Sequence, residues 1–380
     1  MYLRKYMSDE LTNSEKTRYS RHLSLPQVGL EGQLKLTKSS ILVVGAGGLG
    51  SPSLLYLAAA GIGHIGVIDD DVIDITNLQR QVIHNTSSVG EAKVNSAKRR
   101  LLELNPDISV TTFQSRLGID NALDIISKFD IIIDGTDNFQ TRYLINDACE
   151  ILGKPWIFGS IHQFEGQVST FNLSHGTNYR DIFPETPPAG FAPNCSEAGV
   201  LGVLPGIIGS IQATEAIKLV LDIGQPLSCK LLVFDALTMS SRILNFKANT
   251  SRVLISELSL EDEYCMSENT NEILEILPAD YIARKKQGWN PFLLDVRRED
   301  EELIATINGT DLRICHVEIP SRYRELPLDR DLVIYCRSGV RSAAVQRFLS
   351  DSQWPHNNIY NLVGGILNWS NTVDPSIRKY

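Results

Sequence analysis

Short runs of branched apolar residues alternate with longer amphipathic stretches over the first part of the chain. Residues 41–44, 65–68 and 131–133 are apolar or glycine, as is typical of strands buried on both faces. Residues 91–104 have the periodicity of an amphipathic helix, which Asn105-Pro106 ends. Strands that alternate with helices predict a doubly wound α/β sheet with ligands at the carboxyl ends of its strands.

The same pattern predicts further elements of this sheet. A polar start leads into a helix at about 14–22, and apolar runs predict strands at 110–113, 156–159 and 231–235. A helix through about residue 152 lies between the strands at 131–134 and 156–159. The alternation therefore continues to the end of the first part.

Residues 199–221 form the most apolar stretch of the chain. The stretch carries Gln212, Glu215 and Lys218 and is interrupted by Pro205. Ionisable residues are costly at the centre of a bilayer. We therefore expect a buried core helix and no membrane span.

A second alternation follows a polar and acidic stretch at 248–272. Apolar runs predict strands at 292–296, 332–336 and 359–362, with a helix at 342–349 between the last two. This part is a small α/β domain of roughly 100 residues, a common domain size. The predicted organisation is a first domain at 1–247, a linker at 248–272 and a second domain at 273–380.

Composition and charge limit the classes of function. The chain has 380 residues, of which 43% are hydrophobic and 21% charged, as in ordinary soluble proteins. A net charge of −9 argues against nucleic acid as the main partner. The six cysteines have no paired spacing and no signal peptide precedes them, so we expect reduced thiols and a cytoplasmic protein.

A glycine-rich turn follows the first strand. Gly45, Gly47 and Gly50 have the spacing that lets phosphates approach the backbone between a strand and a helix. Asp69 ends the second strand, where a ribose-binding acid is expected. These residues predict a nucleotide-binding βαβ unit, and such units occur most often in nicotinamide or flavin dehydrogenases.

The residues after Asp69 favour phosphoryl chemistry over hydride transfer. Residues 76–81 read Thr-Asn-Leu-Gln-Arg-Gln, and Lys93 starts the next helix. Amide, guanidinium and ammonium groups stabilise negative charge that develops on a phosphoryl group. Asp137, at the end of another strand, suits Mg²⁺, which is usually held by one or two carboxylates and by substrate phosphates.

Five motifs together resemble the MoeB/ThiF group of ubiquitin-activating-enzyme-like adenylyltransferases. They are Gly-Ala-Gly-Gly-Leu-Gly, Asp-Asp-Asp-Val, Thr-Asn-Leu-Gln-Arg-Gln, Gly-Thr-Asp-Asn and Cys195-Ser-Glu-Ala-Gly-Val-Leu-Gly. The resemblance covers about residues 14–245. It implies a Rossmann-like doubly wound sheet and ATP-dependent adenylation of the C-terminal glycine of a ubiquitin-fold sulfur carrier that ends in Gly-Gly.

The resemblance also implies roles for particular residues. The residues that it implies for binding of Mg·ATP are Gly45, Gly47, Gly48, Asp69, Asn77, Arg80, Lys93, Asp137 and Asn138. Asp137 would place Mg²⁺, and Arg21 would reach the phosphates from the second subunit of a homodimer. A lone Arg or Lys is more often a solvated surface charge, so these assignments depend on the whole motif set.

Cys195 lies at the end of a loop-like stretch, 173–194, that contains four prolines. A long segment without predicted secondary structure in a compact domain more often has a function than not. The resemblance implies that Cys195 attacks the acyl-adenylate or enters a disulfide with the carrier. The alternative is a small buried thiol, to which we assign the cysteines at 149, 229, 265 and 315.

The chain departs from the family at a structural metal site. Relatives often carry two Cys-x-x-Cys pairs that hold zinc. Here the first position reads Asn178-Tyr179-Arg180-Asp181, and no such pair occurs after Asp235. We therefore expect no zinc, and other contacts must hold this segment.

Cys336 follows an apolar strand and opens the sequence Cys-Arg-Ser-Gly-Val-Arg-Ser. Backbone N–H groups of such a loop at a helix N-terminus form an anion cradle. The stretch resembles a rhodanese active-site loop, as do Asp295-Val-Arg and residues 362–369 at the start and end of that domain. This resemblance implies a small α/β rhodanese domain with a persulfide on Cys336. Its loop comprises Arg337, Ser338, Gly339, Val340 and Arg341.

Two alternatives to this interpretation stay open. Cysteine phosphatases enclose one residue more between cysteine and arginine than the four found here. An inactive rhodanese-like fold is less consistent with an intact Cys336. Residues 304–320 depart from the rhodanese pattern, which leaves open whether the sulfur donor is a cysteine desulfurase or thiosulfate.

The two halves together predict one pathway, in which a carrier carboxylate is adenylated and then receives persulfide sulfur to give a thiocarboxylate. Fusion raises the effective concentration of one site at the other. The competing hypotheses are a nicotinamide-dependent oxidoreductase fused to a sulfurtransferase and a non-catalytic scaffold for a ubiquitin-like protein. The pathway itself stays open between molybdopterin, thiamine, tRNA thiolation and a secondary metabolite.

Overall fold

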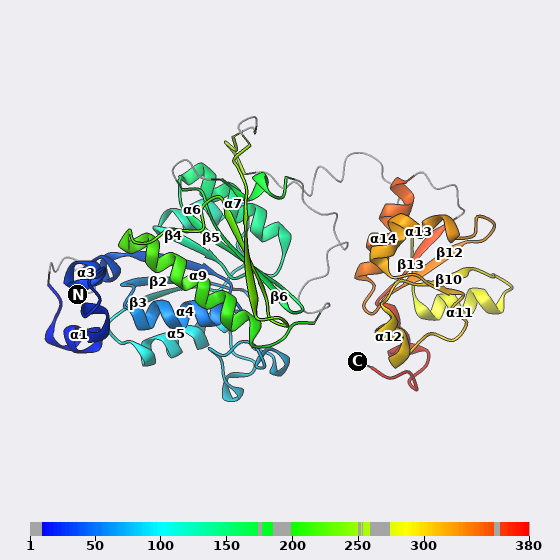
Figure 1. The fold of residues 1–380 in the computed structure, drawn as a ribbon. Helices are drawn as coiled ribbons and strands as arrows, with labels where there is room; N and C mark the ends of the chain where they lie inside the picture. The colour runs from blue at the N-terminus through cyan, green and yellow to red at the C-terminus, as the bar shows by residue number, and fades with distance from the viewer. Residues whose placement is uncertain are drawn as a thin grey trace. The chain divides into compact units, whose positions relative to one another are not determined.

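The computed structural model describes residues 10–173, 177–184, 199–249, 252, 254–258, 274–352 and 358–379. The chain divides into two compact units (Figure 1). The first unit contains strands β1 to β8 and the second contains β9 to β13. Most of the predicted linker lies outside the described residues, so the boundaries at 247 and 273 stay a prediction.

The first unit is built on an eight-stranded sheet with the order β3-β2-β1-β4-β5-β6-β7-β8. The strands are β1 (Ser40–Val44), β2 (His64–Ile68), β3 (Ser109–Phe113), β4 (Ile131–Asp134), β5 (Trp156–His162), β6 (Glu165–Phe171), β7 (Lys230–Asp235) and β8 (Ser240–Asn245). Strands β3, β2, β1, β4 and β5 are parallel, and the remaining pairings are antiparallel. The five parallel strands have the strand order of a Rossmann-like fold.

Helices cover both faces of this sheet, as the doubly wound fold requires (Figure 1). Ile41 and Val43 of β1 pack into one apolar cluster, whereas Leu42 and Val44 pack into the other. The first cluster is completed by α3 (Gly29–Lys38), α4 (Gly50–Ala60), α5 (Lys93–Leu104) and α9 (Leu204–Leu221), and the second by α6 (Ala122–Ser127) and α7 (Phe139–Leu152). The prediction that β1 is buried on both faces is therefore confirmed.

Two strands of the sheet had no signal in the apolar pattern. All six residues of β8 are exposed, so no alternation of buried and exposed positions marks the strand. Strand β6 buries Val168 and Phe171, but it also buries Gly166, Ser169 and Thr170, which are small or polar and interrupt the apolar pattern. Short helices lie before β1 or in the connections between the larger elements. They are α1 (Asn13–Arg18), α2 (Ser20–Leu23), η2 (Ile75–Asn77), η3 (Thr86–Ser88) and η4 (Tyr179–Asp181).

Among the described residues, α9 is the one helix long and apolar enough to cross a membrane by length and composition. Its buried polar side chains instead have partners in the core. The Nε2 of Gln212 donates to the carbonyl of Asp134 at 2.7 Å, and Glu215 accepts from the hydroxyl of Thr170 at 3.0 Å. Helix α9 is therefore a core helix of the first unit.

The second unit has a parallel five-stranded sheet with the order β11-β10-β12-β13-β9. Its strands are β9 (Leu274–Ile276), β10 (Phe292–Asp295), β11 (Leu312–Arg313), β12 (Leu332–Tyr335) and β13 (Ile359–Leu362). Its helices are α11 (Pro278–Lys286), α12 (Glu299–Ile304), η5 (His316–Glu318), α13 (Ile319–Arg322), η6 (Tyr323–Glu325), α14 (Val340–Asp351) and α15 (Gly365–Thr372). Separate apolar clusters line the two faces of the sheet.

Candidate functional site

The turn between β1 and α4 brings the backbone close to the end of β4. A Cβ at Gly45 would lie 2.8 Å from the carbonyl oxygen of Gly135, and Gly45 has a φ of 96°, which favours glycine. A Cβ at Gly50 would lie 1.9 Å from the carbonyl oxygen of Gly45. These glycines are needed because the chain itself is packed closely at this turn.

A cavity of about 340 Å³ opens at the carboxyl ends of the parallel strands. Small-molecule sites usually have volumes of about 300 to 1,000 Å³. Eight predicted site residues line the cavity: Gly45, Gly47, Gly48, Asp69, Arg80, Lys93, Asp137 and Asn138. Asn77 is not among the lining residues; its side-chain oxygen accepts from the backbone N–H of Asp74 at 3.1 Å within the η2 turn.

Asp69 ties the end of β2 to the glycine turn. One carboxylate oxygen accepts from the backbone N–H of Ala46 at 2.8 Å, and the other accepts from the N–H of Asp71 at 2.9 Å. Burial raises the pKa of the Asp69 carboxyl. The nearby positive charge of Lys93 lowers this pKa but does not cancel the rise. Asp69 thus orients the turn as well as lining the cavity.

Lys93 places a buried positive charge at the cavity. Its side chain is 7% exposed, and Nζ lies 2.6 Å from a carboxylate oxygen of the exposed Asp71. Lys93 is also the first residue of α5, where the helix dipole disfavours a cation. A residue such as Lys93, which is unfavourable for the helix in which it lies, is typical of a functional site.

The loop that carries Asp137 is supported by a buried ion pair. The Nε of Arg142 donates to Asp134 at 3.0 Å, and the guanidinium lies 4.9 Å from the centre of the Phe158 ring. The other oxygen of Asp134 accepts from the N–H of Thr136 at 2.9 Å. Asp137 itself is exposed, and no hydrogen bond or ion pair joins its carboxylate to another described residue. Its oxygens are therefore available to a ligand.

The donor groups around the cavity fit a magnesium nucleotide. Carboxylate oxygens of Asp69, Asp70 and Asp71 lie within 4.8 Å of one another, and the Asp137 carboxylate lines the same cavity. Oxygen ligands are those that Mg²⁺ prefers. Arg80 and Lys93 supply the positive charge that phosphates require.

Several lining residues were not among the predicted site residues. Gln81 is buried, and its Oε1 has no hydrogen-bond partner among the described residues. Arg116 and Leu117 follow β3 and complete the wall of the cavity. The alternation of strands and helices could have indicated Arg116 and Leu117, because the carboxyl ends of parallel strands meet at one edge of the sheet.

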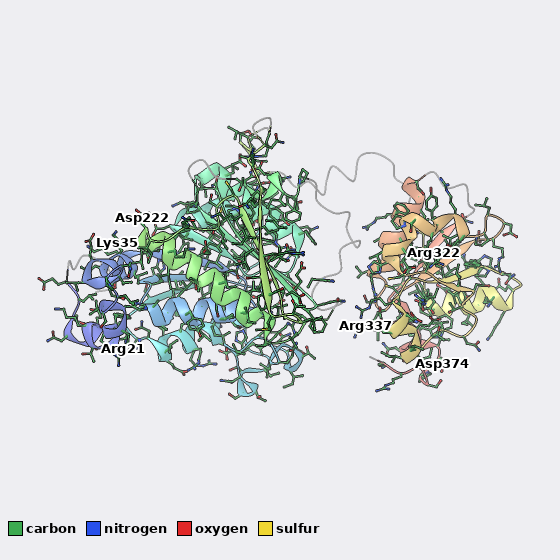
Figure 2. The ribbon with its side chains drawn as sticks, in the orientation of Figure 1. Arg21, Lys35, Asp222, Arg322, Arg337 and Asp374 are labelled. Carbon is green, nitrogen blue, oxygen red and sulfur yellow. The ribbon has the colours of Figure 1, made fainter. Side chains whose placement is uncertain are left out.

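Two predicted residues lie away from this cavity or outside the described residues. Arg21 is an exposed residue of α2 among the N-terminal helices (Figure 2) and does not line the cavity. Its role from a second subunit stays a prediction. Cys195 falls within 185–198 and lies outside the described residues.

In the second unit, Cys336 follows β12 and is 1% exposed. Its sulfur accepts from the backbone N–H of Gly339 at 3.1 Å and from the hydroxyl of Ser342 at 3.4 Å. Gly339 has a φ of 94°, so the loop turns directly into α14. Hydrogen-bond donors at a helix N-terminus favour a negatively charged sulfur.

The arginines of this loop have different environments. Arg341 is buried and donates to both carboxylate oxygens of Glu301 at 2.7 Å. Burial opposes the charge on Glu301, but the bonds from Arg341 outweigh it and the pKa of Glu301 is lowered. Arg337 is exposed on the surface of the unit (Figure 2). Sequence reasoning missed Ser342, although its place six residues after Cys336 is part of the motif.

The segment Asp295-Val-Arg contacts Tyr335, the last residue of β12 before the Cys336 loop. Asp295 and Arg297 form a fully buried ion pair, and the hydroxyl of Tyr335 donates to Asp295 at 3.0 Å. The N–H of Val296 donates to the carbonyl of Tyr335 at 3.0 Å. These residues hold the strand that ends at Cys336.

Family models match both units. The ThiF family model matches residues 19–254, and the Rhodanese-like domain model matches residues 278–372. A "Probable adenylyltransferase/sulfurtransferase MoeZ" of Mycobacterium tuberculosis (strain ATCC 25618 / H37Rv) is 42% identical to this chain. The match covers 97% of this chain and 96% of that protein.

Two further relatives are named for one or both of these activities. An "Adenylyltransferase and sulfurtransferase MOCS3" of Anopheles gambiae is 36% identical over 98% of this chain and 90% of its own length. A "Sulfur carrier protein adenylyltransferase" of Thermus thermophilus is 50% identical over 63% of this chain and 90% of its own length. Among solved structures, E. coli MccB with ATP matches in fold, with a TM-score of 0.53, 23% identity and coverage of 66% of this chain and 76% of that one.

Proposed function

The chain belongs to the ThiF family and is an adenylyltransferase and sulfurtransferase, and from that premise we propose that it converts the C-terminal carboxylate of a ubiquitin-fold sulfur carrier into a thiocarboxylate. The observation that supports the proposal is the pairing, in one chain, of a cation-lined nucleotide cavity with a cradled cysteine. A relative named for adenylation of a sulfur carrier is 50% identical over 63% of this chain.

The first step is attack of the carrier carboxylate on the α-phosphorus of ATP. A new oxygen–phosphorus bond forms, the bond to the β-phosphate breaks, and pyrophosphate leaves with its electron pair. A carboxylate and a phosphate repel one another, so Arg80 and Lys93 would neutralise the phosphates. Asp137, with the acids at 69–71, would hold Mg²⁺, which supplies further charge neutralisation when bound.

The second step uses a persulfide on Cys336. Its terminal sulfur attacks the carbonyl carbon of the acyl-adenylate, and AMP leaves. A thiolate then attacks the Cys336 sulfur of the resulting acyl disulfide, which releases the thiocarboxylate and leaves a disulfide on Cys336. Cys195 is the candidate for this thiolate, and the N–H of Gly339 and hydroxyl of Ser342 would stabilise the persulfide charge. An external dithiol would reduce this disulfide and would itself be oxidised to a disulfide, and thiosulfate or a cysteine desulfurase would then load sulfur onto the Cys336 thiolate again.

The alternatives named from the sequence are set aside by the family assignment. Full-length relatives are enzymes that combine adenylyltransferase and sulfurtransferase activities, so a non-catalytic scaffold and a nicotinamide oxidoreductase are both wrong. The homodimer, the role of Arg21 in the second subunit and the identity of the sulfur donor remain part of the proposal.

The test is carrier-dependent exchange of pyrophosphate into ATP, followed by the mass of the carrier after thiosulfate is added. The purified chain should catalyse exchange only with a carrier ending in Gly-Gly and should replace one carrier oxygen by sulfur. Asp137→Ala should lower the exchange rate by about 100-fold or more, because the carboxylate that would hold Mg²⁺ at the phosphates is lost. Exchange that proceeds without a carrier, or at full rate in Asp137→Ala, would contradict the proposal.

A further inference from the structure

Three segments of the first unit meet at a network of partly buried charges outside both sites. Glu150 comes from α7, Asp181 from the η4 turn, and Arg252 from the residues after β8. The Nη1 of Arg252 lies 2.7 Å from both carboxylate oxygens of Glu150, and its Nε lies 3.2 Å from Asp181. We call these three residues the anchor.

The anchor also holds the backbone of the segment after β8. The N–H of Asn249 donates to Asp181 at 3.1 Å, and the N–H of Ile255 donates to Glu150 at 3.4 Å. Leu258, three residues further on, packs against an apolar cluster of the sheet. The chain is therefore fixed to the first unit as far as Leu258, well beyond the end of β8 at Asn245.

The side chains of the anchor are less exposed than those of surface ion pairs. The side chains of Arg252, Glu150 and Asp181 are 20%, 9% and 1% exposed. Removal of one partner from a buried pair leaves the other charge uncompensated. The anchor is therefore a specific attachment, unlike the exposed pair of Arg242 on β8 and Glu165 on β6, at 3.6 Å.

The η4 turn is itself fastened to α7 by a second ion pair. Arg180 donates to both carboxylate oxygens of Asp147 at 2.9 and 2.8 Å, and Asn178 donates to Glu150 at 2.5 Å. These contacts hold the turn where the sequence has no Cys-x-x-Cys pair. The turn should therefore stay in place when Arg252 is replaced.

We infer that the anchor fixes the point from which the second unit is tethered, and that Arg252, Glu150 and Asp181 are positioning residues for sulfur transfer. The inference depends on the proposed function, because the Cys336 persulfide has to reach the acyl-adenylate. Leu258 and Leu274 are 16 positions apart, and an extended chain of that length spans at most about 55 Å. Asn245 and Leu274 are 29 positions apart, which allows about 100 Å.

The physical consequence is a higher effective concentration of Cys336 at the nucleotide cavity. Effective concentration falls roughly as the −3/2 power of tether length once the tether exceeds the span it bridges. Release of the anchor lengthens the tether from 16 to 29 positions. Sulfur transfer should therefore slow by about two- to threefold, whereas adenylation, which occurs within the first unit, should not change.

The test compares Arg252→Ala with Arg242→Ala in the full chain. Hydrogen exchange of residues 249–258, carrier-dependent pyrophosphate exchange and single-turnover formation of thiocarboxylate from persulfidated protein are measured. Arg252→Ala should speed hydrogen exchange, leave pyrophosphate exchange unchanged and slow thiocarboxylate formation two- to threefold. Arg242→Ala, which removes an exposed arginine of β8, should match the wild type in all three.

A second variant keeps the test decisive if Arg252→Ala does not fold. A 13-residue Gly-Ser insertion between Leu260 and Glu261 lengthens the tether while the anchor stays intact. It should slow thiocarboxylate formation by the same factor without faster exchange at 249–258. Unchanged hydrogen exchange in Arg252→Ala would overturn the anchor, and unchanged sulfur transfer in the insertion variant would overturn its positioning role. A wild-type chain without carrier-dependent pyrophosphate exchange would instead contradict the proposed function.

Discussion

In the nucleotide cavity, charged side chains line an open space and Lys93 is paired there with the exposed Asp71, whereas at the Cys336 loop the neighbouring arginine is paired with a buried carboxylate. Arg80, Lys93 and Asp137 face a cavity of about 340 Å³. Arg341, by contrast, is bound through two hydrogen bonds to Glu301, and the sulfur of Cys336 is contacted by neutral donors. Both sites lie where a strand with parallel neighbours leads through a glycine with positive φ toward a helix.

The difference follows from the charge of what each site would bind. A triphosphate carries several negative charges in a small volume, so it requires cations and a metal. A persulfide carries one charge on one sulfur atom, which the N–H of Gly339 and the hydroxyl of Ser342 can satisfy. The same backbone arrangement thus serves two chemistries, and the side chains around it decide between them.

The largest effect that separates the two sites is expected from Cys336→Ser. Loss of the nucleophilic sulfur should abolish persulfide loading and thiocarboxylate formation, whereas carrier-dependent pyrophosphate exchange should keep its wild-type rate. Mass spectrometry of the chain after incubation with thiosulfate, and of the carrier after addition of ATP, measures both outcomes. Sulfur loading at another cysteine of the variant would show that the cradle is not the sulfur site.

A smaller effect is expected from Gly339→Ala, which tests whether the backbone forms the cradle. Gly339 has a φ of 94°, and a Cβ there would lie 3.0 Å from the backbone nitrogen of Gly364. A left-handed conformation costs a non-glycine residue about 1–2 kcal/mol. Denaturant unfolding should show a loss of at least that size, together with slower persulfide formation. Gly288→Ala is the matched control: Gly288 has the same φ of 94° but open space around it and no contact with the loop. That variant should lose stability without losing sulfur loading.

The effect that separates the two sites least concerns acid stability beside the Cys336 loop. Burial lowers the pKa of His316 to about 4, with a further contribution from the charge of Arg341. Between about pH 6.5 and pH 4, the histidine of the unfolded chain, with a pKa near 6.5, binds a proton, whereas His316 in the folded chain stays neutral. The stabilisation is therefore complete above about pH 6.5 and is lost as the pH falls toward 4, by about 2–3 kcal/mol. His316→Leu should flatten this dependence in denaturant unfolding between pH 7 and 4.5, and an equally steep profile in the variant would contradict the assignment.

The elements that could be predicted from sequence are those whose causes are local. The apolar run of β1, the glycines of its turn and the Cys336 loop each lie within a few consecutive residues. Residues 199–221 were interpreted correctly as a core helix because their polar residues oppose a membrane span. Strand β8 was missed because its side chains are exposed on both faces, so burial imposes no pattern on them.

The supporting pairs could not be predicted in the same way. Glu150 and Arg252 are 102 positions apart, and Glu301 and Arg341 are 40 apart. A charged residue in a sequence is most often a solvated surface residue, so nothing marks one as buried with a distant partner. Ser342 was also missed, although the motif includes it, because its hydroxyl points at the sulfur only once α14 begins at Val340.

The sequence by itself determined the two α/β units, the glycine turn at 45–50, the acids and cations of the nucleotide cavity and the cysteine loop, because short-range periodicity and motif spacing impose them on the backbone. The tertiary structure decided which charges face the cavity and which are paired. It alone showed that Arg142 supports the Asp137 loop, that Arg341 is bound by Glu301 and that Arg252 fastens the chain after β8. Such pairs depend on which distant segments meet in the folded core, where removal of water makes each charge require a partner.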